Sequence, residues 1–187
     1  MTGCHVEPFM CHVSVYELER IVNSEVSEEK KESPPIHEIY HGLLEIAIDE
    51  KGLEIPQAVC LREDGNVELA ALAVTPEQAY KWVLCTAASD THITDIIMGV
   101  DRYTKPGQGN EFGDTIAGVH WTRVGDKKGT FRGFVVDYQF GPPKIVRPVN
   151  YDNAFWNEII KNEFQHCANL LMQTAAQNRL LIEQGGA

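Results

Sequence analysis

The sequence predicts an α+β fold, in which helices pack on a mostly antiparallel sheet of five or six strands. Three observations lead to this fold class. An Asp-Gly turn joins two apolar runs, several strand-like runs follow one another between residues 93 and 149, and helical periodicity precedes, interrupts and follows the strands. The expected order is therefore α-α-β-β-α-β-β-β-(β)-α, with a single domain over residues 33–187.

Residues 1–32 are expected to be an N-terminal extension to this domain. A weak apolar stripe predicts a short helix, and the run SEVSEEKKES predicts an acidic, solvated linker after it. The segment lacks the basic start and long apolar stretch of a signal peptide, and no apolar run approaches the roughly 20 residues of a membrane span. We therefore expect a cytoplasmic protein without membrane contact, whose five cysteines are reduced thiols.

The first half of the domain contains two helices and a hairpin with clear local signals. Two prolines open a helix over residues 36–51, in which apolar residues recur at i, i+3 and i+4 spacing. The Asp-Gly turn then connects strands over residues 57–61 and 67–73. A capping-box pattern that begins at Thr75 predicts a helix to about Ser89.

The second half is expected to consist of strands followed by one long helix. Strands are predicted over residues 93–100, 115–124 and about 131–140, and residues 144–149 suit an edge strand. The last helix begins near Asn153 and runs for about 30 residues. This order of elements is similar to that of profilin-like and roadblock-like folds. The resemblance lies in element order alone, since no sequence motif accompanies it, and a shared fold carries little functional weight.

The charge of the chain is uneven. The net charge is −11, but residues 1–98 hold 6 basic and 18 acidic residues, whereas residues 99–187 hold 10 and 9. The overall negative charge argues against non-specific DNA binding, which needs a basic surface. The local basic excess suits a small anionic ligand, of which a nucleotide is one example.

The segment between the third and fourth strands, residues 101–114, is the strongest candidate for a ligand site. It combines basic and aromatic residues with a Gly-Gln-Gly turn, whose backbone N–H groups can approach an anion closely. It has neither the Walker A order nor a dinucleotide fingerprint. The predicted ligand-binding residues are Arg102, Tyr103, Thr104, Lys105, Gly107, Gln108, Gly109, Arg123 and Arg132.

Our leading hypothesis is a binding module for an anionic small molecule or a protein partner rather than an enzyme. The alternative is a hydrolase or phosphate-handling enzyme, in which His120 works as an acid–base couple with Asp101 or Asp137. No cofactor is expected for the binding module, and Mg²⁺ would join only in the enzymatic alternative. The sequence has no Gly-x-Ser-x-Gly elbow, HExxH or EF-hand spacing to favour that alternative.

Two further expectations concern metals and partners. The dipeptides Cys4-His5 and Cys11-His12 lack the usual zinc spacing, and His37 and His41 are taken as an ordinary helix-face pair, so no metal site is predicted. A homodimer through the long last helix or an exposed sheet edge is expected. A third hypothesis is a protein-interaction scaffold that uses the acidic residues 1–55 as its contact surface.

Overall fold

The computed structural model describes residues 36–49, 52–103, 114–125, 128–139 and 144–185, and the statements below refer to these residues. They form an α+β fold, as predicted. The helices and strands are α2 (Ile36–Ala47), β1 (Gln57–Arg62), β2 (Val67–Ala71), α3 (Pro76–Ser89), β3 (Ile93–Tyr103), β4 (Asp114–Val124), β5 (Lys128–Gln139), β6 (Lys144–Ile145) and α4 (Ala154–Gly185). The short helix expected within residues 1–32 lies outside the described residues.

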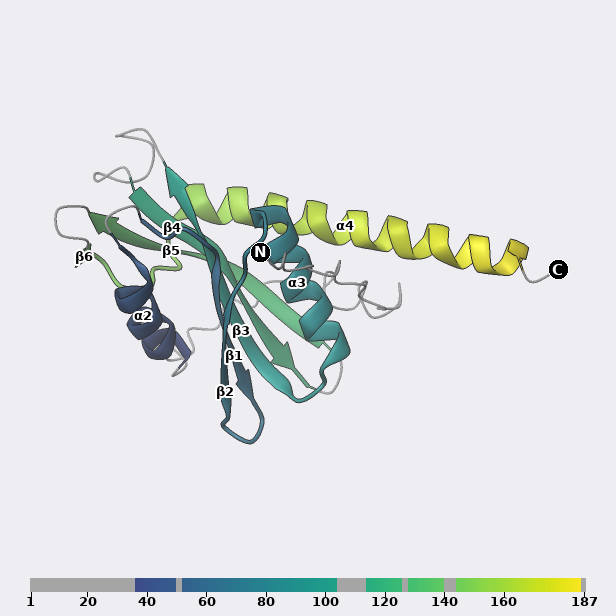
Figure 1. Cartoon of the computed structure of the whole chain (residues 1–187), viewed down its shortest axis with the longest axis horizontal. Coiled ribbons are helices and arrows are strands. Elements are labelled where there is room, and N and C mark those ends of the chain that lie inside the picture. Colours follow the sequence, from purple (N-terminus) through teal and green to yellow (C-terminus); the bar gives the residue numbers. More distant parts are fainter. Residues whose placement is uncertain (1–35, 50–51, 104–113, 126–127, 140–143, 186–187) are drawn as a thin grey trace, which may run out of the picture.

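The strands form one six-stranded sheet of order β2-β1-β3-β4-β5-β6. Every neighbouring pair is antiparallel, which confirms the prediction from the hairpin connections. The long strands β3, β4 and β5 occupy the centre, and the sheet is strongly twisted and curled (Figure 1). The short strands β2 and β6 form its two edges.

Helices cover both faces of this sheet. Helices α3 and α4 pack on one face, and α2 packs on the other, which we call the α2 face (Figure 1). Side chains alternate along β4, where Val119 and Trp121 join the core under α3 and α4 while Ile116 joins the core under α2. Both faces of the sheet are therefore covered by helices.

Local chemistry explains where α3 and the hairpin begin and end. Thr75 accepts a hydrogen bond from the backbone N–H of Gln78, and the Gln78 side chain accepts one from the backbone N–H of Thr75, so the predicted capping box is formed. In the hairpin turn, Gly65 has a φ of 82°, and Asp64 accepts the backbone N–H of Asn66.

Several boundaries differ from the prediction. Helix α2 ends at Ala47 rather than near residue 51, because Asp49 and Gly52 exchange backbone hydrogen bonds in a separate turn. The ladder between β3 and β4 continues to the pair Tyr103–Asp114, so residues 101–103 and 114 belong to strands rather than to a loop. Strand β6 stops at Ile145, since the next two N–H groups both approach the single carbonyl of Asp137.

Helix α4 is as long as predicted, with 32 residues. Asn153 caps it by accepting the backbone N–H of Trp156. Its first half buries Trp156, Ile160 and Phe164 against the sheet and α3, whereas Phe155 is 46% exposed. The second half projects beyond the sheet (Figure 1).

Candidate functional site

Most of the predicted ligand-binding residues lie outside the described part of the chain. Thr104, Lys105, Gly107, Gln108 and Gly109 lie outside the described residues, and so does the side chain of Tyr103. The structure does place the three predicted arginines of the strands, and it separates them. Each is therefore considered by its own contacts.

Arg102 lies on β3 and faces α4. Its guanidinium donates a hydrogen bond to the Glu163 carboxylate of that helix, and its side chain is 24% exposed. Arg102 and Glu163 thus form a part-buried ion pair that holds α4 against the sheet.

Arg123 is held by the backbone at the other end of β4. Its Nε donates to the carbonyl of Ile93 at 2.7 Å, and Nη2 donates to those of Ala87 and Asp90 at 2.8 and 2.9 Å. These carbonyls belong to the end of α3 and the start of β3. Arg102 stands opposite Thr115 in the register, so about eight residues of β4, roughly 25 Å, separate the two arginines.

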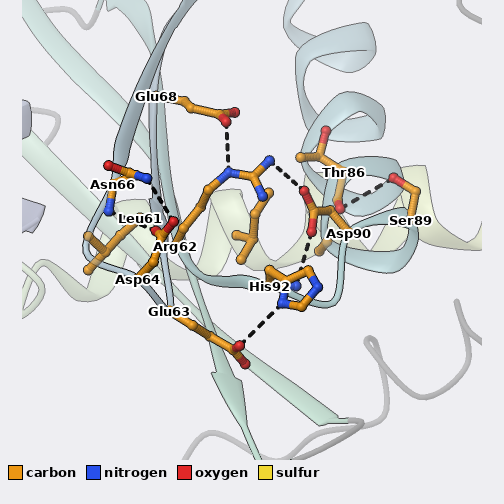
Figure 2. A network of polar contacts seen from close by, with 12 residues as sticks. Leu61, Arg62, Glu63, Asp64, Asn66, Glu68, Thr86, Ser89, Asp90 and His92 are labelled. Carbon is orange, nitrogen blue, oxygen red and sulfur yellow. Dashed lines mark hydrogen bonds and ion pairs between the residues drawn. The ribbon is translucent and has the colours of Figure 1, made fainter.

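A shallow pocket of about 440 Å³ adjoins Arg123 and is lined by Glu63, Thr91, His92, Thr94, Arg123 and Gly125. Beside it, Arg62 donates to Glu68 and Asp90 at 2.7 and 2.6 Å, and His92 lies 3.3 Å from Glu63 (Figure 2). The charged side chains of this network form ion pairs with one another. These ion pairs hold the β1–β2 hairpin to the turn between α3 and β3.

Among the three predicted arginines that the structure describes, Arg132 has the fewest partners. It lies on the α2 face of β5, directly opposite His120 of β4 in the register. Its guanidinium carbon stands 3.8 Å from the centre of the Tyr151 ring, in a cation–π contact. The described part of the chain offers its N–H groups no hydrogen bond or ion pair. Burial lowers the pKa of Arg132, which nevertheless remains a cation at neutral pH.

The structure does not place His120 beside Asp101 or Asp137. Asp101 accepts a hydrogen bond from the Tyr138 hydroxyl at 2.8 Å, and one from the backbone N–H of Leu53 at 3.1 Å. Asp137 lies on the face of the sheet opposite to that of His120 and is 5% exposed. It accepts a hydrogen bond from Thr115 at 3.1 Å, and burial raises its pKa.

The carboxylate beside His120 is that of Asp95 on β3. Asp95 Oδ1 lies 3.2 Å from His120 Nε2 and accepts the Thr122 hydroxyl at 2.9 Å. On the other side of the imidazole, Nδ1 lies 3.0 Å from the Tyr151 hydroxyl and 3.2 Å from His37 Nε2. We call Arg132 and these five residues the polar cluster of the α2 face.

Proton positions in this cluster follow from the hydrogen-bond partners. The Asp95 pKa is lowered in spite of its burial, because His120 and Thr122 donate to it, so it is a carboxylate at neutral pH. His120 Nε2 then donates to Asp95, and its Nδ1 accepts from Tyr151 or His37. Burial lowers the pKa of both imidazoles, that of His37 to about 3, with the nearby Arg132 cation acting in the same direction. Both histidines are therefore neutral.

Three neighbours of His120 on this face were not among the predicted site residues. Asp95 could have been assigned to the same face as Ile97 by strand alternation, and its pairing with His120 then needs only the β3–β4 register. His37 appeared to be half of a helix-face pair, whereas it is 6% exposed and packs edge-on against His120. Tyr151 sits in an irregular segment, where periodicity gives no orientation.

Metal and membrane signals are both lacking in what the structure describes. Over the described ranges, no three His, Cys, Asp or Glu side chains converge on a point that could hold a metal ion. Likewise, no described helix is long and apolar enough to cross a membrane. The dipeptides Cys4-His5 and Cys11-His12 are outside those ranges.

Comparison with known proteins leaves the polar cluster as the main functional evidence. The cluster must therefore be interpreted from its own chemistry. No family model, no curated protein and no solved structure matches this chain.

Proposed function

We propose that this protein is a binding module for a small oxyanion, a carboxylate or a phosphate group, and that Arg132 is the residue that holds it. The observation that carries the proposal is the state of Arg132. It is a half-buried cation stacked on Tyr151, without a hydrogen-bond acceptor among the described residues. A guanidinium has five N–H donors in a planar fork that fits carboxylate and phosphate oxygens.

The surroundings support binding of an anion rather than an internal ion pair. Asp152 and Asp95 are the carboxylates whose charge favours the Arg132 cation, but neither forms an ion pair with it among the described residues, and the Asp95 oxygens accept from His120 and Thr122. The neutral histidines add no charge. Stacking on Tyr151 fixes the guanidinium plane before ligand arrives, which lowers the entropy lost on binding.

A thermal-shift titration of the full chain with inorganic phosphate and acetate tests this proposal. A ligand at about 100 times its dissociation constant adds near 3 kcal/mol of stability, which raises Tm by roughly 5 °C or more in a chain of this size. We expect Arg132→Gln to lose the shift. The matched control is Arg147→Gln, a 55% exposed arginine whose loss should leave the shift intact. An equal shift in both variants, or none in the parent, contradicts the proposal.

Acid–base chemistry is the second candidate function, now with Asp95 in place of Asp101. It is favoured by the chain of contacts from Asp95 through His120 to the Tyr151 hydroxyl, which ends beside Arg132. Asp95 would orient the imidazole of His120, and His120 Nδ1 would accept the proton of the Tyr151 hydroxyl.

Tyr151→Phe separates the two candidates. It keeps the ring under Arg132 and removes the hydroxyl, so oxyanion binding should remain. If the protein hydrolyses a phosphate monoester such as p-nitrophenyl phosphate, this variant should lose that turnover while it still binds phosphate. An inactive parent rules out this second function for that substrate.

A further inference from the structure

Strand β2 forms an exposed edge of the sheet. In the part of the chain that the structure describes, it pairs with β1 alone. Leu69 is 60% exposed and Val67 38%, although both are large apolar residues. Edge strands are commonly protected by lysine, proline or a covering element, and residues 67–71 contain no lysine or proline. This edge therefore has the features of a strand-pairing surface.

The pairing with β1 shows which backbone groups of β2 face outward. Just before and after the strand, Arg62 N–H donates to the Asn66 carbonyl at 2.9 Å, and Leu72 N–H donates to the Pro56 carbonyl at 2.8 Å. In an antiparallel pair, hydrogen-bonded and non-hydrogen-bonded positions alternate. The even-numbered residues of β2 thus bond to β1, while Val67, Leu69 and Ala71 direct their N–H and C=O groups outward.

We infer that a second copy of this chain pairs with that edge, antiparallel, about a twofold axis at Leu69. The outward groups of the strand are self-complementary in this register. Leu69 stands opposite Leu69 of the second copy, and Val67 stands opposite Ala71, so all outward residues meet outward residues. Three such residues on each strand provide about six main-chain hydrogen bonds. The exposed Leu69 side chains meet at the axis and lose contact with water.

Charge does not oppose this contact, in spite of the net charge of −11. The charged residue of β2 is Glu68, which in the proposed register faces Ala70 of the second copy rather than its own equivalent. Its carboxylate already accepts a hydrogen bond from Arg62 Nε at 2.7 Å (Figure 2). In each copy, the charge of Glu68 at the interface is thus balanced by Arg62.

The size of the contact sets its strength. One five-residue strand from each copy covers less area than the interfaces of stable dimers, so the dimer should be weak and concentration-dependent. This inference concerns the edge of the sheet and is independent of the oxyanion site on the α2 face.

Sedimentation of the full chain over a wide concentration range tests the inference. The parent should show reversible dimerisation. Because residue 69 faces its own copy, Leu69→Lys and Leu69→Glu should each weaken the dimer by about tenfold or more through like charges. An equimolar mixture of the two variants should restore it, since lysine then faces glutamate. Val74→Lys, at an apolar site that is 38% exposed and lies beyond β2, should leave dimerisation unchanged.

Two results would overturn the inference. One is a parent chain that stays monomeric at the highest soluble concentration. The other is a dimer that persists in both charge variants, which would place the contact elsewhere, for example on α4. Circular dichroism of each variant checks that the fold is intact, and the recovery in the mixture distinguishes a charge effect from misfolding.

Discussion

Asp95 and His120 form a buried hydrogen-bonded pair across β3 and β4, with 3.2 Å between Oδ1 and Nε2. Asp95 is 8% exposed and His120 1%. The pair determines the direction of the other hydrogen bonds in the polar cluster, because a proton on Nε2 leaves Nδ1 as an acceptor for Tyr151 and His37. The stability of the α2 face and any chemistry at Tyr151 both depend on this pair.

Asp95→Asn should destabilise the protein by about 1–2 kcal/mol. The substitution keeps the size of the side chain but replaces a charge-assisted hydrogen bond with a neutral one, which is weaker. Equilibrium unfolding in urea measures the change. Glu45→Gln is the control, because Glu45 is 62% exposed on α2 and its neutralisation should change the free energy of unfolding by no more than about 0.5 kcal/mol. Equal effects of the two substitutions would contradict a special role for Asp95.

Stability should fall as the pH is lowered from about 6.5 toward 3. The pKa of His37 is depressed from 6.5 to about 3 in the folded state, so between these values the unfolded chain binds a proton that the folded chain does not. Folding stability therefore decreases with falling pH in this window, by up to about 1.4 kcal/mol per pH unit for each such proton. The lowered pKa of His120 acts in the same direction.

Urea unfolding at a series of pH values measures this slope. His37→Gln should reduce it, because the substitution removes a proton-binding site that the folded state keeps empty. His92→Gln is the control, since His92 is 72% exposed and its removal should leave the slope as it was. An unchanged slope in His37→Gln would show that His37 is not a source of the acid sensitivity.

The fold was predictable from local signals, whereas the polar cluster depended on register. The capping box at Thr75 and the turn at Gly65 are encoded within a few residues, so the corresponding elements appear where expected. The partner of His120 depends on the pairing of β3 with β4, which brings together two residues 25 positions apart in the sequence. A shift of the register by one residue would place Asp95 on the other face of the sheet. The sequence-based hypothesis instead paired His120 with Asp101 or Asp137, but Asp101 accepts the hydrogen bond of Tyr138 and Asp137 that of Thr115.

The predicted arginines show likewise that local charge in the sequence does not identify a ligand-binding residue. A basic excess in the sequence does not say which cations are already paired. Arg102 bonds to Glu163 and Arg123 to three carbonyl oxygens, partners that lie 30 to 61 positions away along the chain. Only the tertiary structure distinguishes Arg102 and Arg123 from Arg132, whose guanidinium N–H groups bind the ligand in our proposal.

Arg123→Met should lower stability by about 2 kcal/mol, because it removes the donors to the carbonyls of Ala87, Asp90 and Ile93 at the end of α3. The phosphate or acetate response of the folded protein should survive. Urea unfolding and the thermal-shift titration measure the two effects. Lys161→Met, on the exposed side of α4, is the control and should change stability by at most about 0.5 kcal/mol. Loss of binding without loss of stability would restore Arg123 as a ligand residue.

Gly118→Ala should be among the most damaging small substitutions in the chain. Gly118 stands opposite Gly99 where β3 and β4 approach closely, and an added Cβ would lie 1.9 Å from the Met98 carbonyl oxygen and 2.5 Å from the Gly99 Cα. Both are backbone atoms, so the strands must separate. We expect a loss of about 3 kcal/mol or more in the free energy of unfolding.

Gly42→Ala provides the matched control for this prediction, since the same methyl group is added where nothing lies within 4 Å. Gly42 is inside α2, where alanine restricts the unfolded chain and favours the helix, so the substitution should stabilise the protein by about 0.5–1 kcal/mol. Opposite signs for the two variants in urea unfolding would confirm the close approach of β3 and β4. A tolerated Gly118→Ala would mean that these strands lie farther apart at this point, and the register that brings Asp95 to His120 would then need to be measured directly.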